Sequence, residues 1–466
     1  MAQSGSGPRD ARADGDRPVS RDVRSAIIVG VQLPEDNEAR LVEDLDELEA
    51  LLSTLGVITC GRIVQRRQRL TAKCLLGTGK VDEIRELAKA REARLVVFDR
   101  PLSPPQVRNL EEMTGCEILD RAGVILEIFA RHARTTQAKT QVEIARLEYM
   151  LPRLSGAWTH LHRQRGGGVV RGMGEKQIEI DRRRARERIS RLKDQLQHMA
   201  EDRRVQRKAR RSEIKVALVG YTNSGKTTLM NALTHAKLQA KDALFVTLDS
   251  NVRTLDPATR PKILLSDTVG FIRNLPHGLI ESFKSTLDEV LEADLLLHVV
   301  DISHPGYQAQ LDTTAKVLEE IGASAIPMIM VFNKIDRIDD PFLAKVLRQA
   351  WPGSIALSAY NDEDALRLRT HIYKFFETNF VRARLTIPAA DQEAVSLVYN
   401  TCLVVETDYE MQGFVRIDVQ ATRASIERLR RFVTRETIQE KTPGDTTSGF
   451  ADRPRYQPRG KRFTWK

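Results

Sequence analysis

The sequence predicts an α/β protein of several domains, and three observations carry that prediction. The chain has 466 residues, whereas a single domain has about 150, so about three domains are expected. Apolar runs of strand length alternate with segments of helical periodicity over most of its length. At its centre, residues 214–233 combine an apolar strand, a loop punctuated by glycines and a helix, which is a typical unit of α/β folds.

Composition and charge narrow the classes of function. Hydrophobic residues make up 41% of the chain, and no apolar run approaches the ~20 residues that span a bilayer, so we expect no integral membrane association. Residues 1–22 lack the apolar core of a secretory signal, which predicts a disordered tail and a cytoplasmic protein. The net charge of +10 favours a polyanionic partner, with nucleic acid as the first candidate.

The cysteines do not indicate a metal site. There are four of them, scattered along the chain without C-x-x-C spacing: Cys60, Cys74, Cys116 and Cys402. This pattern argues against a zinc site and against a disulfide framework. We interpret them as buried or unreactive thiols.

Residues 23–135 are predicted to form a first, small α/β domain. Residues 26–31 and 95–98 are apolar runs typical of strands, and residues 41–55 carry apolar side chains at helical spacing. Residues 103–107 resemble a helix start with proline in its first turn.

A glycine-containing segment of this domain, residues 77–80, resembles half of a phosphate-binding loop. It lacks the upstream glycine at the required distance. We therefore predict a tight turn that caps a helix over residues 81–90.

Residues 136–212 change to amphipathic helices. Apolar side chains recur at 3-4-3 spacing twice, first at Ile144, Leu147, Leu151 and Leu154 and then at Ile189, Leu192, Leu196 and Met199. Between them, residues 163–174 are rich in glycine and carry arginines. The plainest arrangement is an antiparallel helical hairpin with this loop at its tip, and the alternative is a flexible linker.

The second of these helices is dense in arginine. The arginines are Arg182, Arg183, Arg184, Arg186, Arg188 and Arg191. Runs of this kind usually form solvated faces, and interleaved acidic residues dilute their charge, so contact with nucleic acid and a solvated face both remain open.

Two further segments follow the central domain, which we place at residues 213–380. Residues 381–440 offer helix-like and strand-like stretches and predict a small α+β domain. Residues 441–466 mix arginine and lysine with aromatic side chains. Such a tail can stack on RNA, but a solvated, disordered tail is the equal alternative.

The central strand, loop and helix have the form of a phosphate-binding loop. Gly220 and Gly225 allow sharp turns that point successive N–H groups inward. Lys226 is placed to reach the β- and γ-phosphates, and the Thr227 hydroxyl to ligate Mg²⁺. The flanking strand and helix supply the context that an incidental Gly-rich turn would lack.

Two downstream segments complete a site for a triphosphate and its metal. Residues 263–267 form an apolar strand that delivers Asp267 toward Mg²⁺, and the N–H of Gly270 is placed to sense the γ-phosphate. Thr247, in a loop between the two motifs, is the candidate that completes the metal shell.

The identity of the base follows from residues 330–336, a strand that ends in Asn-Lys-x-Asp. The Asp336 carboxylate can accept hydrogen bonds from guanine N1–H and the exocyclic amine, whereas adenine would leave that carboxylate unpaired. Asn333 and Lys334 would brace the loop, and Ser358 and Ala359 fit a backbone contact to the guanine carbonyl. The motifs together predict binding of GTP and GDP.

The candidate site divides into catalytic, metal and binding residues. The catalytic candidates are Lys226, Thr247 and Gly270, and the metal candidates are Thr227, Thr247 and Asp267. The nucleotide-binding candidates are Gly220, Tyr221, Thr222, Asn223, Ser224, Gly225, Lys226, Thr227, Phe245, Val246, Thr247, Leu248, Asp249, Asp267, Thr268, Val269, Gly270, Asn333, Lys334, Ile335, Asp336, Ser358, Ala359 and Tyr360. Mg²⁺ with GTP is the expected cofactor. Because Asn223 occupies a loop position that some related GTPases use to hold an alkali cation, K⁺ is a candidate second cation.

With these motifs in place, residues 23–435 resemble the HflX family of ribosome-associated GTPases, which is related to the translation factors. Besides the GTPase motifs, the resemblance rests on residues 77–80, 120–121, 128–131, 141–143, 147–149, 151–154 and 180–183. The family pattern at the tip, Arg-Gly-Pro-Gly-Glu-Thr-Gln, differs here at Met173 and Lys176. The resemblance implies a P-loop GTPase domain preceded by an α/β domain with a helical hairpin and followed by a small α+β domain.

The resemblance also implies partners and function. It implies a GTP hydrolase that binds the large (50S) ribosomal subunit and its rRNA and couples GTP to ribosome splitting, rescue or biogenesis. We expect a monomer. The alternative is an RNA-binding ribosome assembly factor that uses GTP mainly as a structural switch. A third interpretation, an ATP-driven RNA remodeller, finds no complete phosphate loop outside residues 220–227.

Overall fold

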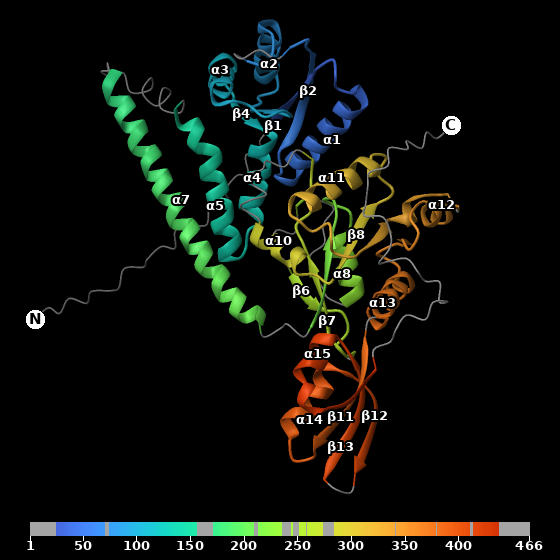
Figure 1. Cartoon of the computed structure of the whole chain (residues 1–466). Coiled ribbons are helices and arrows are strands. Elements are labelled where there is room, and N and C mark those ends of the chain that lie inside the picture. Colours follow the sequence, from blue (N-terminus) through green and yellow to red (C-terminus); the bar gives the residue numbers. More distant parts are fainter. Residues whose placement is uncertain are drawn as a thin grey trace, which may run out of the picture.

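A computed structural model describes residues 25–69, 74–155, 171–208, 213–234, 244–245, 251–257, 259–273, 284–340, 342–378, 380–410 and 413–437. These residues form three sheets, each with its own buried core. The first and third sheets lie at opposite ends of the molecule, and the nucleotide-binding sheet lies between them (Figure 1). The predicted α/β class is confirmed, while the predicted tails at residues 1–22 and 441–466 lie outside the described residues.

The N-terminal sheet is parallel, with the strand order β2-β1-β3-β4. Its strands are β1 (Ser25–Gln32), β2 (Ile58–Arg66), β3 (Leu95–Phe98) and β4 (Glu117–Asp120), and its helices are α1 (Glu38–Thr54), α2 (Thr78–Ala90), α3 (Pro104–Thr114) and α4 (Arg121–His132). Ile27, Ile28 and Val29 of β1 are fully buried because helices cover both faces of a parallel sheet. The apolar runs predicted at residues 26–31 and 95–98 are therefore strands.

Two helix starts in this domain were predicted, and one of them is corrected. Helix α3 begins at Pro104 as expected, and the Ser103 N–H donates to the Gln106 side chain at 2.9 Å. Helix α2 begins at Thr78, earlier than the predicted residue 81. Gly77 is its N-cap, and its N–H donates to the Gln65 side chain of β2 at 3.0 Å, so a tertiary contact fixes the earlier start.

Helices α5 (Thr136–Met150) and α7 (Arg171–Lys208) form the predicted hairpin and run side by side (Figure 1). A short 3₁₀ helix, η1 (Leu151–Ser155), follows α5. The core of their contact is apolar and joins the two predicted stripes, through Ile144, Ile189 and Leu192 with Leu147, Leu151 and Leu196 packed against them. A packed hairpin therefore replaces the alternative of a flexible linker.

The predicted tip loop is shorter than residues 163–174. Residues 171–174 form the first turn of α7, and residues 163–170 lie outside the described residues. Gly172 and Gly174 each disfavour a helix by about 1 kcal/mol, but the helix-forming residues that follow them outweigh this cost.

The central sheet has six strands in the order β10-β9-β8-β5-β7-β6, all parallel except the edge strand β6. The strands are β5 (Ile214–Val219), β6 (Asn251–Thr254), β7 (Ile263–Asp267), β8 (Leu295–Asp301), β9 (Met328–Asn333) and β10 (Ile355–Ala356). The helices are α8 (Lys226–Thr234), α10 (Lys284–Leu291), α11 (Tyr307–Glu320), α12 (Leu343–Ala350) and α13 (Asp362–Glu377). Because β5, β7, β8 and β9 are parallel neighbours, the loops at their carboxyl ends meet at one edge of the sheet.

The C-terminal sheet is antiparallel, in the order β12-β13-β11-β14. It comprises β11 (Val381–Pro388), β12 (Leu403–Glu410), β13 (Phe414–Ala421) and β14 (Val433–Thr437), with α14 (Gln392–Thr401), α15 (Arg423–Arg428) and the 3₁₀ helix η3 (Arg430–Phe432). Alternate residues of β11 and β13 are buried, including Leu385, Ile387 and Ile417 at 0% exposure. This alternation is typical of a sheet with one covered face, and the predicted small α+β unit is confirmed.

The structure also bears on membrane-spanning helices and on the state of the cysteines. Within the described part of the chain, no helix is both long and apolar enough to cross a bilayer. The four cysteines are thiols outside any disulfide, and three of them, Cys74, Cys116 and Cys402, are buried. Burial raises the pKa of Cys402, which agrees with an unreactive thiol.

Candidate nucleotide-binding site

The phosphate loop joins β5 to α8, and Lys226 lies at its centre. Its ammonium group donates to the carbonyl oxygens of Gly220 at 3.1 Å and Tyr221 at 2.8 Å. Burial lowers the pKa of Lys226 to about 8, while the charge of Asp267 opposes that shift. A polyphosphate beside this buried cation would favour its charged form, so the electrostatics fit an anionic ligand.

Gly225 is required by the approach of the base-binding loop. Its φ is +93°, and a Cβ at this position would lie 2.2 Å from Nδ2 of Asn333. Asn333 is buried at the end of β9, and its Nδ2 donates to the carbonyl oxygen of Ser224 at 2.9 Å. A side chain at residue 225 would therefore separate the two motifs that are predicted to bind the phosphates and the base.

The predicted metal ligands Thr227 and Asp267 meet, since the Thr227 hydroxyl donates to Oδ2 of Asp267 at 2.6 Å. Asp267 is fully buried at the end of β7. Among the described residues, no hydrogen-bond partner is found for the buried hydroxyls of Thr222 and Ser224, which line the same loop. Oxygen ligands beside buried hydroxyls fit a magnesium ion with phosphate groups, and Mg²⁺ would supply positive charge at the reacting phosphate.

The loop before the third predicted ligand is only partly described. Val246, Thr247, Leu248 and Asp249 lie outside the described residues. Phe245 is described, with a φ of +57° and 3% exposure, and its ring packs edge-to-face on Phe129 of α4 with centroids 4.7 Å apart. Phe245 thus contacts the N-terminal domain.

Asn333 braces the base-binding loop from both sides. Its Oδ1 accepts from the Ala359 N–H at 3.0 Å, so the amide predicted to contact guanine is engaged by Asn333 in this structure. Ser358 lies beside it, with its N–H donating to Asp364 at 2.9 Å, and Tyr360 is 77% exposed. The strand ends of β9 and β10 thereby converge on one loop.

Lys334 links the same loop to the phosphate loop. It has a φ of +64°, and its ammonium group donates to the Asn223 carbonyl oxygen at 2.8 Å and pairs with Asp301 of β8 at 2.7 Å. Asp336 follows in the 3₁₀ helix η2 (Ile335–Arg337) with its side chain exposed, available to a base. Asp301 was not predicted from the sequence because it is the last residue of an ordinary apolar strand.

The predicted residues Thr268, Val269 and Gly270 form the segment that follows β7. The Thr268 hydroxyl donates to the Leu218 carbonyl oxygen at 2.6 Å, and Val269 is 8% exposed in the core shared with the N-terminal domain. The Phe271 N–H donates to the Gly220 carbonyl oxygen at 3.0 Å. Gly270 is therefore held directly beside the phosphate loop.

The sequence analysis missed a set of contacts from the N-terminal domain to this site. Tyr221 of the phosphate loop hydrogen-bonds Glu47 of α1, and Arg273 pairs with Glu43 and Asp44 of the same helix. The available signal was the acidic cluster at residues 43, 44 and 47 of an otherwise amphipathic helix, which resembles an ordinary solvated face.

Family models and a solved structure that are similar to this chain belong to GTP-binding proteins. Family models match residues 42–130 (GTP-binding GTPase N-terminal), 132–210 (GTP-binding GTPase Middle Region) and 215–334 (50S ribosome-binding GTPase). A GTP-binding protein of Sulfolobus solfataricus, solved in complex with GDP, is 24% identical and has a TM-score of 0.41, covering 75% of this chain and 98% of that one.

Similarity to other proteins extends over most of the chain. The GTPase HflX of Gluconacetobacter diazotrophicus is 42% identical over 442 residues, covering 87% of this chain and 97% of that protein. The GTPase HflX of Escherichia coli K12 is 40% identical over 402 residues, covering 85% and 93%. Coverage of this extent reaches well beyond the central domain that carries the GTPase motifs. The chain belongs to the HflX family of GTPases and hydrolyses GTP.

Proposed function

We propose that this GTPase is Mg²⁺-dependent, docks on the large ribosomal subunit through rRNA, and couples GTP binding and hydrolysis to ribosome splitting, rescue or biogenesis. The observation that carries the proposal is a guanine-nucleotide site braced through Asn333, in a domain that matches the model of 50S ribosome-binding GTPases. In this proposal Lys226 binds the β- and γ-phosphates, the Gly270 N–H senses the γ-phosphate, and Thr227, Thr247 and Asp267 hold the metal. We further propose that it acts as a cytoplasmic monomer.

The exposed arginine face of α7 supports docking on RNA. Arg183 is paired with Glu187 at 2.9 Å on α7, and Arg188 with Glu143 of α5 at 2.9 Å. Exposed ion pairs of this kind contribute little to stability, so rRNA phosphates could replace these carboxylates at little cost. Each neutralised phosphate would release counterions, which makes docking dependent on salt concentration.

Cosedimentation with purified ribosomal subunits tests this function. The protein should migrate with the large subunit in the presence of a non-hydrolysable GTP analogue, migrate there less with GDP, and leave it as salt rises. Binding to the small subunit alone, or equal binding with both nucleotides, would contradict the proposal. Nucleotide-dependent binding without multiple turnover of GTP would instead indicate an assembly factor that uses GTP as a structural switch.

We also propose that Asn223 helps to hold K⁺ beside the phosphates, where the cation would act as a fixed positive charge. GTP turnover should then be faster in K⁺ than in Na⁺ buffers of equal ionic strength. An Asn223→Ala variant should lose that difference. Asn223 has a φ of +58°, which asparagine tolerates better than most residues, so equal turnover in K⁺ and Na⁺ would leave it a purely conformational role.

A further inference from the structure

The N-terminal domain reaches the phosphate loop through one tyrosine. Tyr221 is 4% exposed, and its hydroxyl donates to Oε1 of Glu47 at 2.5 Å. The same hydroxyl accepts from the backbone N–H of Arg273 at 3.0 Å. One buried hydroxyl therefore joins α1, the phosphate loop and the segment that follows β7, three parts that are distant in sequence.

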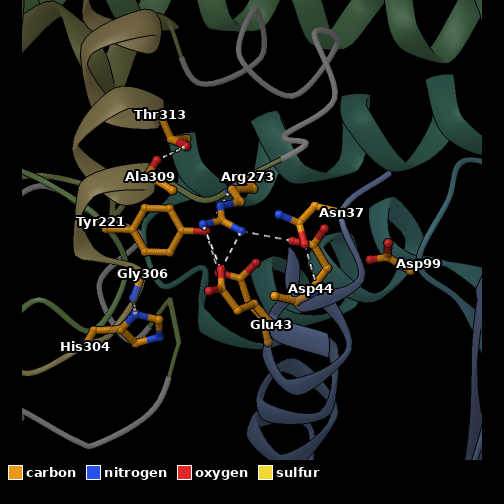
Figure 2. A network of polar contacts seen from close by, with 12 residues as sticks. Asn37, Glu43, Asp44, Asp99, Tyr221, Arg273, His304, Gly306, Ala309 and Thr313 are labelled. Carbon is orange, nitrogen blue, oxygen red and sulfur yellow. Dashed lines mark hydrogen bonds and ion pairs between the residues drawn. The ribbon is translucent and has the colours of Figure 1, made fainter. Parts of the chain in front are cut away.

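The two partners of this hydroxyl, Glu47 and Arg273, each form ion pairs with other residues. Arg273 is 7% exposed, and its guanidinium donates to Asp44 at 3.2 Å and to Glu43 at 3.3 Å. Figure 2 shows Glu43 and Asp44 converging with Tyr221 on Arg273. On the other side, Glu47 pairs with Arg121, a fully buried residue of α4. Buried charges with several partners each hold a defined geometry, because a lost partner leaves an uncompensated charge.

An apolar contact reinforces the polar one. Tyr221, Phe245, Val269 and Ile272 of the GTPase domain share one buried cluster with α1 and α4. The Leu244 N–H also donates to the Thr54 hydroxyl at the end of α1, at 3.3 Å. Both chain segments that flank the phosphate site, residues 244–245 and 269–273, are thus packed on the N-terminal domain.

The segment held in this way carries the peptide that would meet the γ-phosphate. The Phe271 N–H donates to the Gly220 carbonyl oxygen at 3.0 Å, and the Thr222 N–H donates to the Phe271 carbonyl oxygen at 2.8 Å. A Cβ on Gly270 would lie 2.8 Å from the Thr222 Cα and 3.0 Å from the Lys226 ammonium nitrogen. A side chain at residue 270 would therefore collide with the phosphate loop, and only glycine allows this close contact.

We propose that Tyr221 is a positioning residue through which Glu47 and the rest of helix α1 hold the Gly270 peptide at the phosphate loop. Hydrolysis by the GTPase domain then depends on a hydrogen bond to the N-terminal domain. This dependence is expected in the isolated protein, so it does not require ribosome docking.

Tyr221→Phe removes the hydroxyl and keeps the ring in its apolar cluster. Single-turnover hydrolysis by this variant should be slower by about tenfold or more, since small misplacements of a reacting group cost up to about a hundredfold. The ratio of affinity for a non-hydrolysable GTP analogue to affinity for GDP should fall, because only GTP presents the γ-phosphate to Gly270. Affinity for GDP itself should stay within about twofold of the wild type.

Tyr149→Phe is the matched control. Tyr149 is partly buried, and its hydroxyl, like that of Tyr221, donates to a carboxylate, that of Asp120 at 2.8 Å, in a contact within the N-terminal domain. Its variant should lose stability without changing the rate or the affinity ratio. If both tyrosine variants change the rate equally, or if Tyr221→Phe leaves the rate and the affinity ratio unchanged, Tyr221 has no positioning role.

A double-mutant cycle with Glu47→Gln tests whether the effect crosses the domain boundary. The amide keeps an acceptor for the Tyr221 hydroxyl, so the single Glu47→Gln variant should be less impaired than Tyr221→Phe. The double variant should be no slower than Tyr221→Phe alone, since the shared bond is already gone. Fully multiplicative effects on the rate would show that the two side chains act separately and would overturn the proposal.

Discussion

Replacing Asp336 with asparagine is expected to change the preferred base from guanine to xanthine. The carboxylate would accept from two guanine donors, N1–H and the exocyclic amine, and each hydrogen bond to a charged group contributes about 1.5–3 kcal/mol. The amide of the Asp336→Asn variant would place a donor opposite the guanine amine, whereas xanthine presents a carbonyl oxygen there. GTP affinity should therefore fall by roughly a hundredfold or more, and XTP affinity should rise.

Competition binding with GTP, GDP and XTP measures this switch. Asp339→Asn is the control, because Asp339 is an exposed aspartate three positions further along the same loop and its substitution makes the same change of charge. The control should keep the guanine preference. Unchanged affinities of the Asp336→Asn variant for GTP and XTP would show that Asp336 does not contact the base.

Much of the nucleotide site could be predicted from the sequence because each motif is a short continuous segment. The phosphate loop needs a strand, a turn and a helix in succession, and its neighbours β7 and β9 are apolar runs that end in polar residues. Parallel pairing then brings these ends together without further information. The contact between Asn333 and Ser224, at 2.9 Å, is the result of that arrangement.

The interface with the N-terminal domain could not be predicted in the same way. Glu47 and Tyr221 are 174 positions apart, and neither belongs to a pattern that marks a long-range contact. The acidic residues of α1 satisfy the rule for a solvated helix face equally well. Phe245 similarly gave no sign that it would pack on Phe129, since aromatic pairs have no fixed spacing in sequence.

Helix boundaries were the other source of error. Helix α2 starts at Thr78 and helix α7 at Arg171, each earlier than expected, because glycines near a helix start cost little enough for other contacts to outweigh them. A tip variant that preserves α7 should replace residues 165–170 and leave Arg171 in place.

Large ribosomal subunits are expected to accelerate GTP hydrolysis strongly. Phe271 occupies the position where many GTPases carry a glutamine that orients the attacking water, and its side chain is 3% exposed in an apolar cluster with Val219. It offers no hydrogen bond to water, so the isolated protein should turn over at about 10⁻⁴ to 10⁻² s⁻¹. A group supplied or positioned by the subunit could contribute as much as roughly 10³- to 10⁵-fold, in the range known for such partners.

The tip of the hairpin should be needed for this acceleration. A short Gly-Ser loop in place of residues 165–170 removes Arg165, whose charge we expect to favour contact with rRNA phosphates. This variant should bind GTP with wild-type affinity, because the predicted nucleotide site lies at the central six-stranded sheet and not in the helical hairpin. Its hydrolysis should no longer respond to large subunits.

Steady-state phosphate release with and without purified large subunits is the most direct test of a ribosome-activated GTPase. The wild type should be slow alone and at least about tenfold faster with large subunits, while the tip variant stays slow in both conditions. Fast release by the isolated wild type would contradict the argument from Phe271, and undiminished stimulation of the tip variant would contradict docking through the hairpin. A wild type that is slow in both conditions would contradict activation by the large subunit itself.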